Sequence, residues 1–91
     1  MSVETTIREK LTQAFHPVRL EVINESHLHA GHRSSPGTGE SHFRVLIVSA
    51  LFTGKSRLAR HRLVNETLAA ELTGKVHALA LVTHAPGEDA R

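Results

Sequence analysis

The sequence predicts a single small α+β domain, and three observations support that class. Apolar residues spaced by three and four mark one helix near the N-terminus and a second in the middle of the chain. Alternating apolar residues mark two strands between these helices and a third strand after them. With 91 residues, of which 40% are hydrophobic, the chain can bury one modest core. We therefore expect one domain over residues 1–91, in the order α-β-β-α-β.

The first helix is predicted over residues 2–15. Its apolar residues Ile7, Leu11 and Phe15 recur at intervals of four, which places them on one face. Pro17 follows, and it ends the helix because a proline disfavours the helical conformation in the residue before it. The helix is therefore amphipathic, with one face available for packing.

Two strands are predicted over residues 18–25 and 42–49. The second strand is apolar on both faces at its centre, which is typical of a central strand. Residues 27–39, between the strands, contain Gly, Ser and Pro and are predicted as a loop. Long loops in compact domains are often functional or disordered, and we expect residues 30–40 to be flexible.

A turn and a cap precede the second helix. Gly54 supplies the turn, and Ser56 can accept a hydrogen bond from an otherwise unpaired N–H at the helix start. No Gly or Pro interrupts residues 57–72, and Gly74 is predicted to end the helix in the left-handed conformation. Apolar residues lie on two sides of this helix. We therefore expect two packing contacts, one with the sheet and one with the first helix or a partner.

The third strand is predicted over residues 76–83. Residues 85–91 are predicted as a frayed tail, which leaves an ordered core of about residues 2–84. The first two strands should pair antiparallel through their loop. The second strand, the long helix and the third strand form a crossover, which should be right-handed and make those strands parallel. The expected result is a three-stranded mixed sheet with helices on one face.

Basic residues concentrate at the start of the second helix, although the formal net charge is only +2. The start of a helix already carries a partial positive charge, so further cations there favour an anion. A nucleic-acid backbone and a docking partner are both open as that anion, and so is a set of solvated charges whose stems cover apolar surface. The candidate binding residues are Lys55, Arg57, Arg60, His61 and Arg62.

The absence of cysteine excludes disulfides, and it excludes any thiolate ligand or nucleophile from this chain. No stretch approaches the roughly 18 continuous apolar residues of a membrane helix, and the N-terminus has no apolar signal core. We expect a cytoplasmic protein that does not enter a membrane. We also expect no enzyme, because nucleophile-elbow, phosphate-loop and dinucleotide motifs are missing. The segment TGKS at residues 53–56 lacks the upstream glycine that a phosphate loop requires.

Histidine is unusually frequent, and it is the commonest metal ligand. In the loop, His27, His29 and His32 could turn toward one metal ion, and imidazole suits zinc, iron, copper and nickel. Solvent-exposed loop histidines remain the alternative. His77, in the third strand, could equally be a residue at the edge of the core. The eight histidines are His16, His27, His29, His32, His42, His61, His77 and His84.

The second helix resembles the signature helix of the BolA family. The resemblance is carried by FTGKSRLARHRLVNETL, with its Phe-x-Gly and Arg-His-Arg motifs, and by LEVINESHLHAGH, SHFRVLIVS and VHALALVTHAP in the family's order and spacing. It covers roughly residues 7–86. It implies a topology similar to the second class of KH domains. Family members usually add a short last helix that ends in an aromatic residue, whereas this sequence ends in EDAR.

The resemblance implies a function as well. BolA-like proteins pair with monothiol glutaredoxins and share a bridging [2Fe–2S] cluster. The family pattern implies His77 as one cluster ligand and, through the motif Glu-Ser-x-x-His, His29 as the second, with His32 close enough to substitute. The glutaredoxin cysteine and glutathione would supply sulfur, which suits a chain without cysteine. We therefore expect an adaptor in iron–sulfur cluster handling or iron signalling, with no cofactor in the isolated chain.

Some BolA relatives regulate transcription, so DNA binding through residues 55–62 is the alternative function. The sequence has no Tyr or Trp to stack on bases, and the basic segment is short. Any affinity for DNA should therefore be modest and sensitive to salt. Alone, the chain is expected to be a monomer or a weak homodimer.

Overall fold

The computed structural model describes residues 2–25, 42–74 and 76–88. The described elements occur in the predicted order, with the second helix in two pieces. They are α1 (Val3–Phe15), β1 (Arg19–Asn24), β2 (His42–Val48), the 3₁₀ turn η2 (Ala50–Phe52), α2 (Arg57–Thr67), α3 (Ala69–Leu72) and β3 (Ala78–His84). None of the helices in these described ranges is long and apolar enough to cross a membrane.

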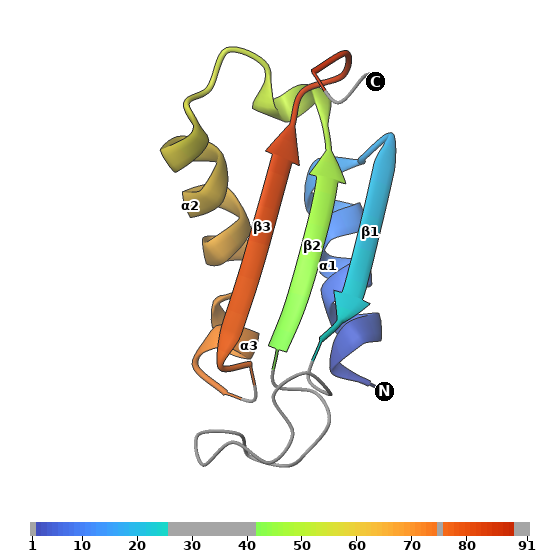
Figure 1. Cartoon of the computed structure of the whole chain (residues 1–91), viewed down its shortest axis with the longest axis vertical. Coiled ribbons are helices and arrows are strands. Elements are labelled where there is room, and N and C mark those ends of the chain that lie inside the picture. The colour runs from blue at the N-terminus through green and yellow to red at the C-terminus, as the bar shows by residue number, and fades with distance from the viewer. Residues whose placement is uncertain (1, 26–41, 75, 89–91) are drawn as a thin grey trace.

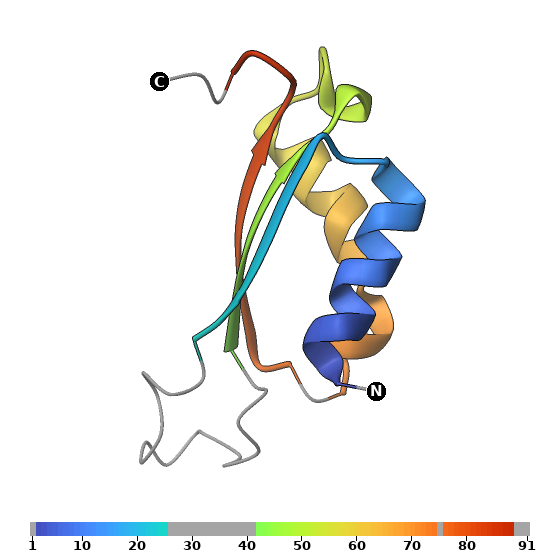
Figure 2. The ribbon, with the colours of Figure 1, turned by 90° about the vertical axis from the view of Figure 1, so that its right-hand side faces the viewer.

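The strands form one three-stranded sheet in the order β1-β2-β3. β1 pairs antiparallel with β2, and β2 pairs parallel with β3. The helices cover one face of the sheet and leave the other face open, and the connection from β2 through α2 to β3 is right-handed (Figures 1 and 2). The predicted α+β class and mixed sheet are therefore confirmed.

The core lies between the sheet and the helices. Strand alternation directs every second residue of β2 toward the helices, and α2 meets them with residues spaced by four. These side chains are at most 2% exposed: Phe43, Val45, Ile47, Val64 and Leu68. On the open face Ile23 is 45% exposed, because the described helices all lie on the other side of the sheet.

The first helix ends in an unusual way. Ser2 caps its start, and Ile7, Leu11 and Phe15 form its buried face. His16 then adopts φ 46° and ψ 55°, a left-handed conformation that side chains other than glycine rarely take. Its N–H still donates to the Thr12 carbonyl, so the helix end is satisfied.

The sequence predicted one continuous helix over residues 57–72, but the structure has two. The side chain of Thr67 donates to the Leu63 carbonyl at 2.9 Å, which is a contact that bends helices. Leu68 then leaves the helical conformation, with φ −102° and ψ 19°, and its side chain is buried. The predicted helix is thus divided at Leu68 into α2 and α3.

Gly74 does not take the left-handed conformation predicted for it. Among the described glycines, only Gly54 (φ 77°) and Gly87 (φ 93°) are left-handed. The hydroxyl of Thr73 instead donates to the Ala69 carbonyl at 3.0 Å at the end of α3. A Cβ atom added at Gly74 would lie 3.1 Å from the Ala70 carbonyl oxygen, so close backbone approach favours glycine there.

Candidate functional site

The histidine end of the sheet is defined by His42 and His77. His77 is exposed and immediately precedes β3, whereas the sequence predicted it inside a strand over residues 76–83. His42 is the first residue of β2. The centres of the two imidazole rings are 6.2 Å apart, and their planes are inclined by 33°.

The sheet topology explains why these two histidines meet. Parallel strands begin at the same end of a sheet, and the register pairs His42 with Ala78. β1 finishes at this end too, where the Glu25 N–H donates to the His42 carbonyl at 2.8 Å. Residues 26–41 therefore leave from Glu25 and return to His42 at the histidine end.

The loop histidines predicted as ligands, His29 and His32, lie outside the described residues. Within the described ranges, no group of three or more His, Asp or Glu side chains could hold a metal ion. Two imidazoles on one tetrahedral metal have ring centres about 5 to 6 Å apart, given metal–nitrogen distances near 2.1 Å. His42 and His77 are close to that spacing, so they could give a metal two nitrogen ligands if others came from elsewhere.

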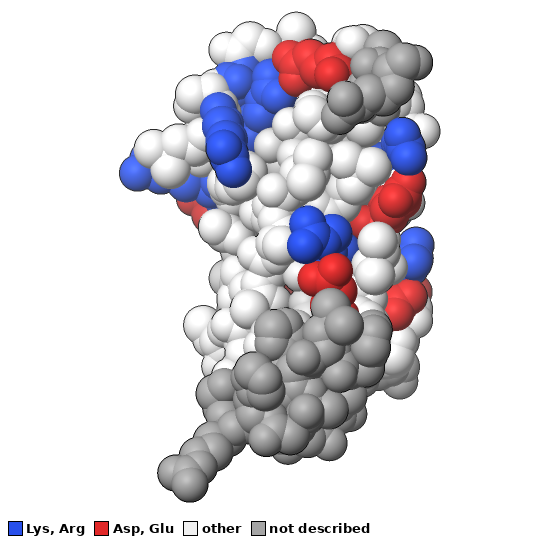
Figure 3. Space-filling view, in the orientation of Figure 1, with Lys and Arg blue, Asp and Glu red and all other residues white. Residues whose placement is uncertain are grey.

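The cationic corner, at the other end of β3, comprises Lys55, Arg57, Arg60, His61 and Arg62. Gly54 makes the predicted turn before it, and the Ser56 hydroxyl accepts the Ala59 N–H at 3.1 Å, as predicted for a cap. Lys and Arg side chains gather over the start of α2 (Figure 3). Lys55, Arg57 and Arg62 are exposed there.

Arg60 differs from the other cations of the corner because its guanidinium is buried and bound internally. Its Nε donates to the Lys55 carbonyl at 2.9 Å, and Nη1 donates to the Thr83 carbonyl at 3.2 Å. Two further bonds, of 2.6 and 3.0 Å, reach the carboxylate of Glu88. Arg60 thus joins α2, β3 and the segment after β3, and its charge is already paired.

Glu88 holds the end of the described chain in place. Its Oε1 accepts the Ala85 N–H at 2.9 Å in addition to the Arg60 bond. The hydrogen bond from Arg60, and then that from the Ala85 N–H, lower the pKa of Glu88 from 4.5 to about 2. The bond between Arg60 and Glu88 also raises the pKa of Arg60. Residues 85–88 depart from the frayed tail that we expected, because Ala85 is buried and Glu88 is bound.

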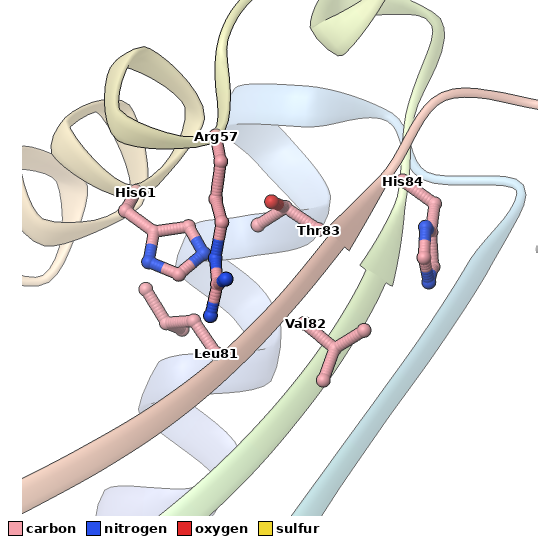
Figure 4. A pocket seen from close by; sticks show the side chains of 6 residues that line it. All are labelled: Arg57, His61, Leu81, Val82, Thr83 and His84. Atoms are coloured by element: carbon pink, nitrogen blue, oxygen red, sulfur yellow. The ribbon is translucent and has the colours of Figure 1, made fainter. Parts of the chain in front are cut away.

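A pocket of about 290 Å³ opens between α2 and β3 (Figure 4). Burial lowers the pKa of His61, and the neighbouring charge of Arg57 lowers it further. His61 is therefore mainly neutral at pH 7, and Arg57 supplies the fixed positive charge of the pocket. The lining residues are Arg57, His61, Leu81, Val82, Thr83 and His84.

Sequence reasoning missed the position of His42 and the internal role of Arg60. The parallel pairing of the second and third predicted strands could have indicated the first, because it brings both strand starts together. The spacing of Arg60, Val64 and Leu68 could have indicated the second. Residues four apart share a helix face, so Arg60 lies on the face that carries the buried Val64 and Leu68.

Comparison with known proteins gives one family. Residues 11–88 match the family described as BolA-like protein. The chain is 59% identical over 92 residues to an uncharacterized protein of Sinorhizobium sp, covering 100% of this chain and 99% of that one. It is 50% identical over 84 residues to the DNA-binding transcriptional regulator BolA of Escherichia coli, covering 92% of this chain and 76% of that one.

Solved structures agree with these sequence matches. BolA1 from Arabidopsis thaliana superposes with a TM-score of 0.89 at 39% identity, covering 99% of this chain and 98% of that one. The BolA domain of SufE1, also from Arabidopsis thaliana, superposes with a TM-score of 0.87 at 45% identity, covering 97% and 96%. The sheet and helices described above are thus the fold of these proteins.

Proposed function

Since the chain belongs to the BolA family, as its signature helix indicated, we propose that it is a non-enzymatic adaptor that pairs with a monothiol glutaredoxin. The pair would share a bridging [2Fe–2S] cluster, in iron–sulfur cluster handling or iron signalling. The names of its relatives describe regulators or BolA-like proteins rather than enzymes, which agrees with a non-enzymatic role at the level of the family.

The observation that carries this proposal is the position of His77. Its side chain is exposed at the start of β3, beside His42, where residues 26–41 leave the sheet and return to it. A chain without cysteine offers no thiolate ligand, and imidazole nitrogen suits iron. The partner cysteine and glutathione would supply the sulfur ligands, and histidine ligation raises the potential of such a cluster.

His77 is assigned as one ligand in this proposal, and a loop histidine as the second. His29 is the first choice because it matches the family motif, and His32 is near enough in sequence to replace it. Both belong to the segment between Glu25 and His42, which are bonded to each other, and His42 lies beside His77. The two ligands therefore need not be close in sequence to act on one cluster.

The test is co-expression with the monothiol glutaredoxin of the same cell, followed by a visible absorption spectrum. The complex should show charge-transfer bands of a [2Fe–2S] centre that differ from those of the glutaredoxin alone. His77→Ala should remove the difference, whereas His84→Ala, at the other end of β3, should keep it. A His77→Ala complex with the wild-type spectrum would refute the ligand assignment.

The loop ligand needs its own comparison. His29→Ala should weaken the cluster bands only in part, because His32 can take its place. The double change His29→Ala and His32→Ala should weaken them further. If the single and double variants behave alike, the two histidines are not interchangeable.

DNA binding is the second candidate function. The exposed side chains of Lys55, Arg57 and Arg62 favour it, and the Escherichia coli relative is named as a DNA-binding transcriptional regulator. Arg60 contributes little, because Glu88 already pairs its charge. In gel shifts, Lys55→Glu with Arg57→Glu should abolish retention of duplex DNA, whereas Arg19→Glu on β1 should not. Binding should fall with salt on a shallow slope, since few phosphates are contacted. Retention that survives the double change would exclude this surface.

A further inference from the structure

One edge of the sheet is open for strand pairing beside the cationic corner. Within the described ranges, β3 pairs with β2 on one side and with no strand on the other. The His84 carbonyl accepts the Ser49 N–H at 3.0 Å, on the β2 side. The next carbonyl back, of Thr83, accepts Arg60 Nη1 at 3.2 Å instead.

These two contacts fix the direction of the other main-chain groups of β3. In a strand, the N–H and C=O of one residue point to the same side, and those of the next residue point to the opposite side. Leu79 and Leu81 therefore direct theirs away from β2, as does the N–H of Thr83. The free edge of β3 thus offers donors and acceptors in alternation, at the spacing of a strand.

The pocket lies along this free edge. Its floor is partly apolar, from Leu81 and Val82, and Arg57 and His61 stand on the α2 side (Figure 4). A chain that paired with β3 here would direct alternate side chains to the face on which Arg57 and His61 lie. One of those side chains would meet a guanidinium that is exposed.

We propose that the free edge of β3 binds an extended peptide segment of a partner protein, and that an Asp or Glu of that segment pairs with Arg57. The peptide would add a fourth strand to the sheet, which is a common mode of peptide recognition. This binding is separate from the proposed cluster function. The paired edge begins at Leu79, two residues after His77, whereas the Arg57 pocket lies toward His84, about 20 Å from His77 along the strand.

The chemistry of the edge favours a peptide over a nucleic acid. A phosphodiester chain only accepts hydrogen bonds, so it cannot pair with carbonyl groups such as that of Leu81. Base stacking needs exposed aromatic rings, but the sequence has no Tyr or Trp, and its three Phe are buried. Among the described residues that line the pocket, Arg57 is the one with a permanent charge.

The charge of the pocket likewise disfavours a second copy of this chain as the occupant. Two β3 edges paired about a two-fold axis near Thr83 would bring both copies of Arg57 toward one another. Like charges that face each other across strands are destabilising. A carboxylate from a different chain removes that repulsion, and a bond between an ionised carboxylate and a guanidinium is strong.

The test uses a short capped peptide that alternates Thr and Val around one central Glu. By NMR, it should shift the amide signals of Leu79, Leu81 and Thr83. A matched peptide with Gln in place of Glu should bind about tenfold more weakly. Arg57→Gln should abolish this preference for Glu, whereas Arg62→Gln, outside the pocket lining, should keep it.

A second peptide checks strand pairing without altering the protein. N-methylation of alternate residues removes the donors that would face β3, and it should abolish binding. Equal binding of the methylated peptide would refute pairing at this edge, as would shifts confined to other amides. Two further results would also overturn the proposal. In the first, duplex DNA shifts these amide signals at physiological salt while the peptide does not. In the second, self-association of the protein broadens these signals.

Discussion

The two ends of β3 carry polar side chains of different kinds, which differ in exposure and in internal bonding. At the histidine end, His77 is exposed, and His42 beside it begins the neighbouring strand. At the cationic corner, Arg60 is buried and bonded to Lys55, Thr83 and Glu88. A polar cluster near a strand end can thus be exposed to solvent, or it can be buried and bonded within the fold. Changes at the two ends should therefore have separate effects, on partner chemistry and on stability.

The largest contrast in stability should come from removing Arg60. Arg60→Ala leaves the Glu88 carboxylate and the Thr83 carbonyl without their donor, so the melting temperature should fall by several degrees. His77→Ala, at an exposed position, should change the free energy of unfolding by no more than about 0.5 kcal/mol. Thermal unfolding followed by circular dichroism compares the two. Equal losses would mean that both ends are structural.

Acid should expose the same contrast through Glu88. Its pKa is about 2 in the folded protein and 4.5 ordinarily, so the unfolded chain binds the proton first as pH falls. The stability that Glu88 contributes is complete above 4.5 and is lost as pH falls toward about 2. Urea unfolding across this range should show a weaker dependence on pH for Glu88→Gln than for the wild type. Identical slopes would show that the Arg60–Glu88 contact does not hold in solution.

A smaller effect of pH is expected in the pocket. The pKa of His61 is lowered from 6.5, so His61 gains its proton only at more acidic pH. The peptide with a central Glu should therefore bind more tightly as pH falls below 6.5, because the pocket gains charge while that Glu stays ionised. His61→Asn should reduce this gain. His84 also faces the pocket, and His84→Asn measures its share. A gain that persists in both single variants and in their combination would place the titrating group elsewhere.

The smallest expected effect concerns His42. Its ring lies beside that of His77 without belonging to the family motif, so it should position the ligand rather than bind the cluster. His42→Asn should therefore weaken the [2Fe–2S] bands of the glutaredoxin complex without abolishing them. Visible spectra beside those of His77→Ala give the comparison. Complete loss in both variants would make His42 a ligand in its own right.

Much of the fold could be predicted because spacing patterns between nearby residues indicate most of its helices and strands. The spacing of Ile7, Leu11 and Phe15 predicted α1, and alternation predicted the three strands. The break at Leu68 could not be predicted in the same way. It coincides with a bond from the Thr67 side chain to the Leu63 carbonyl, and Thr67 gives no sign in the sequence of whether its hydroxyl makes that bond. Gly74 was misread because close approach of a carbonyl and left-handed geometry both favour glycine.

The candidate sites were predictable only in part. The sequence pointed to His77 through the family motif, but its neighbour His42 follows from the register of two strands that are far apart in the chain. The cationic cluster was correctly located at the start of α2. Which of its members face solvent depends on Glu88, which lies 28 residues from Arg60. Contacts of that range leave no local pattern.

The Arg60–Glu88 contact also has a practical consequence for labelling the protein. It anchors the chain as far as Glu88 beside the cationic corner, whereas α1 begins at the end of the sheet where β3 starts (Figure 1). A fluorophore attached before Ser2 would therefore report on events near His77. One attached beyond Glu88 would report on the Arg57 pocket. Expression of a shortened chain should keep Glu88, since removal of that residue would leave Arg60 as a buried cation without its counter-ion.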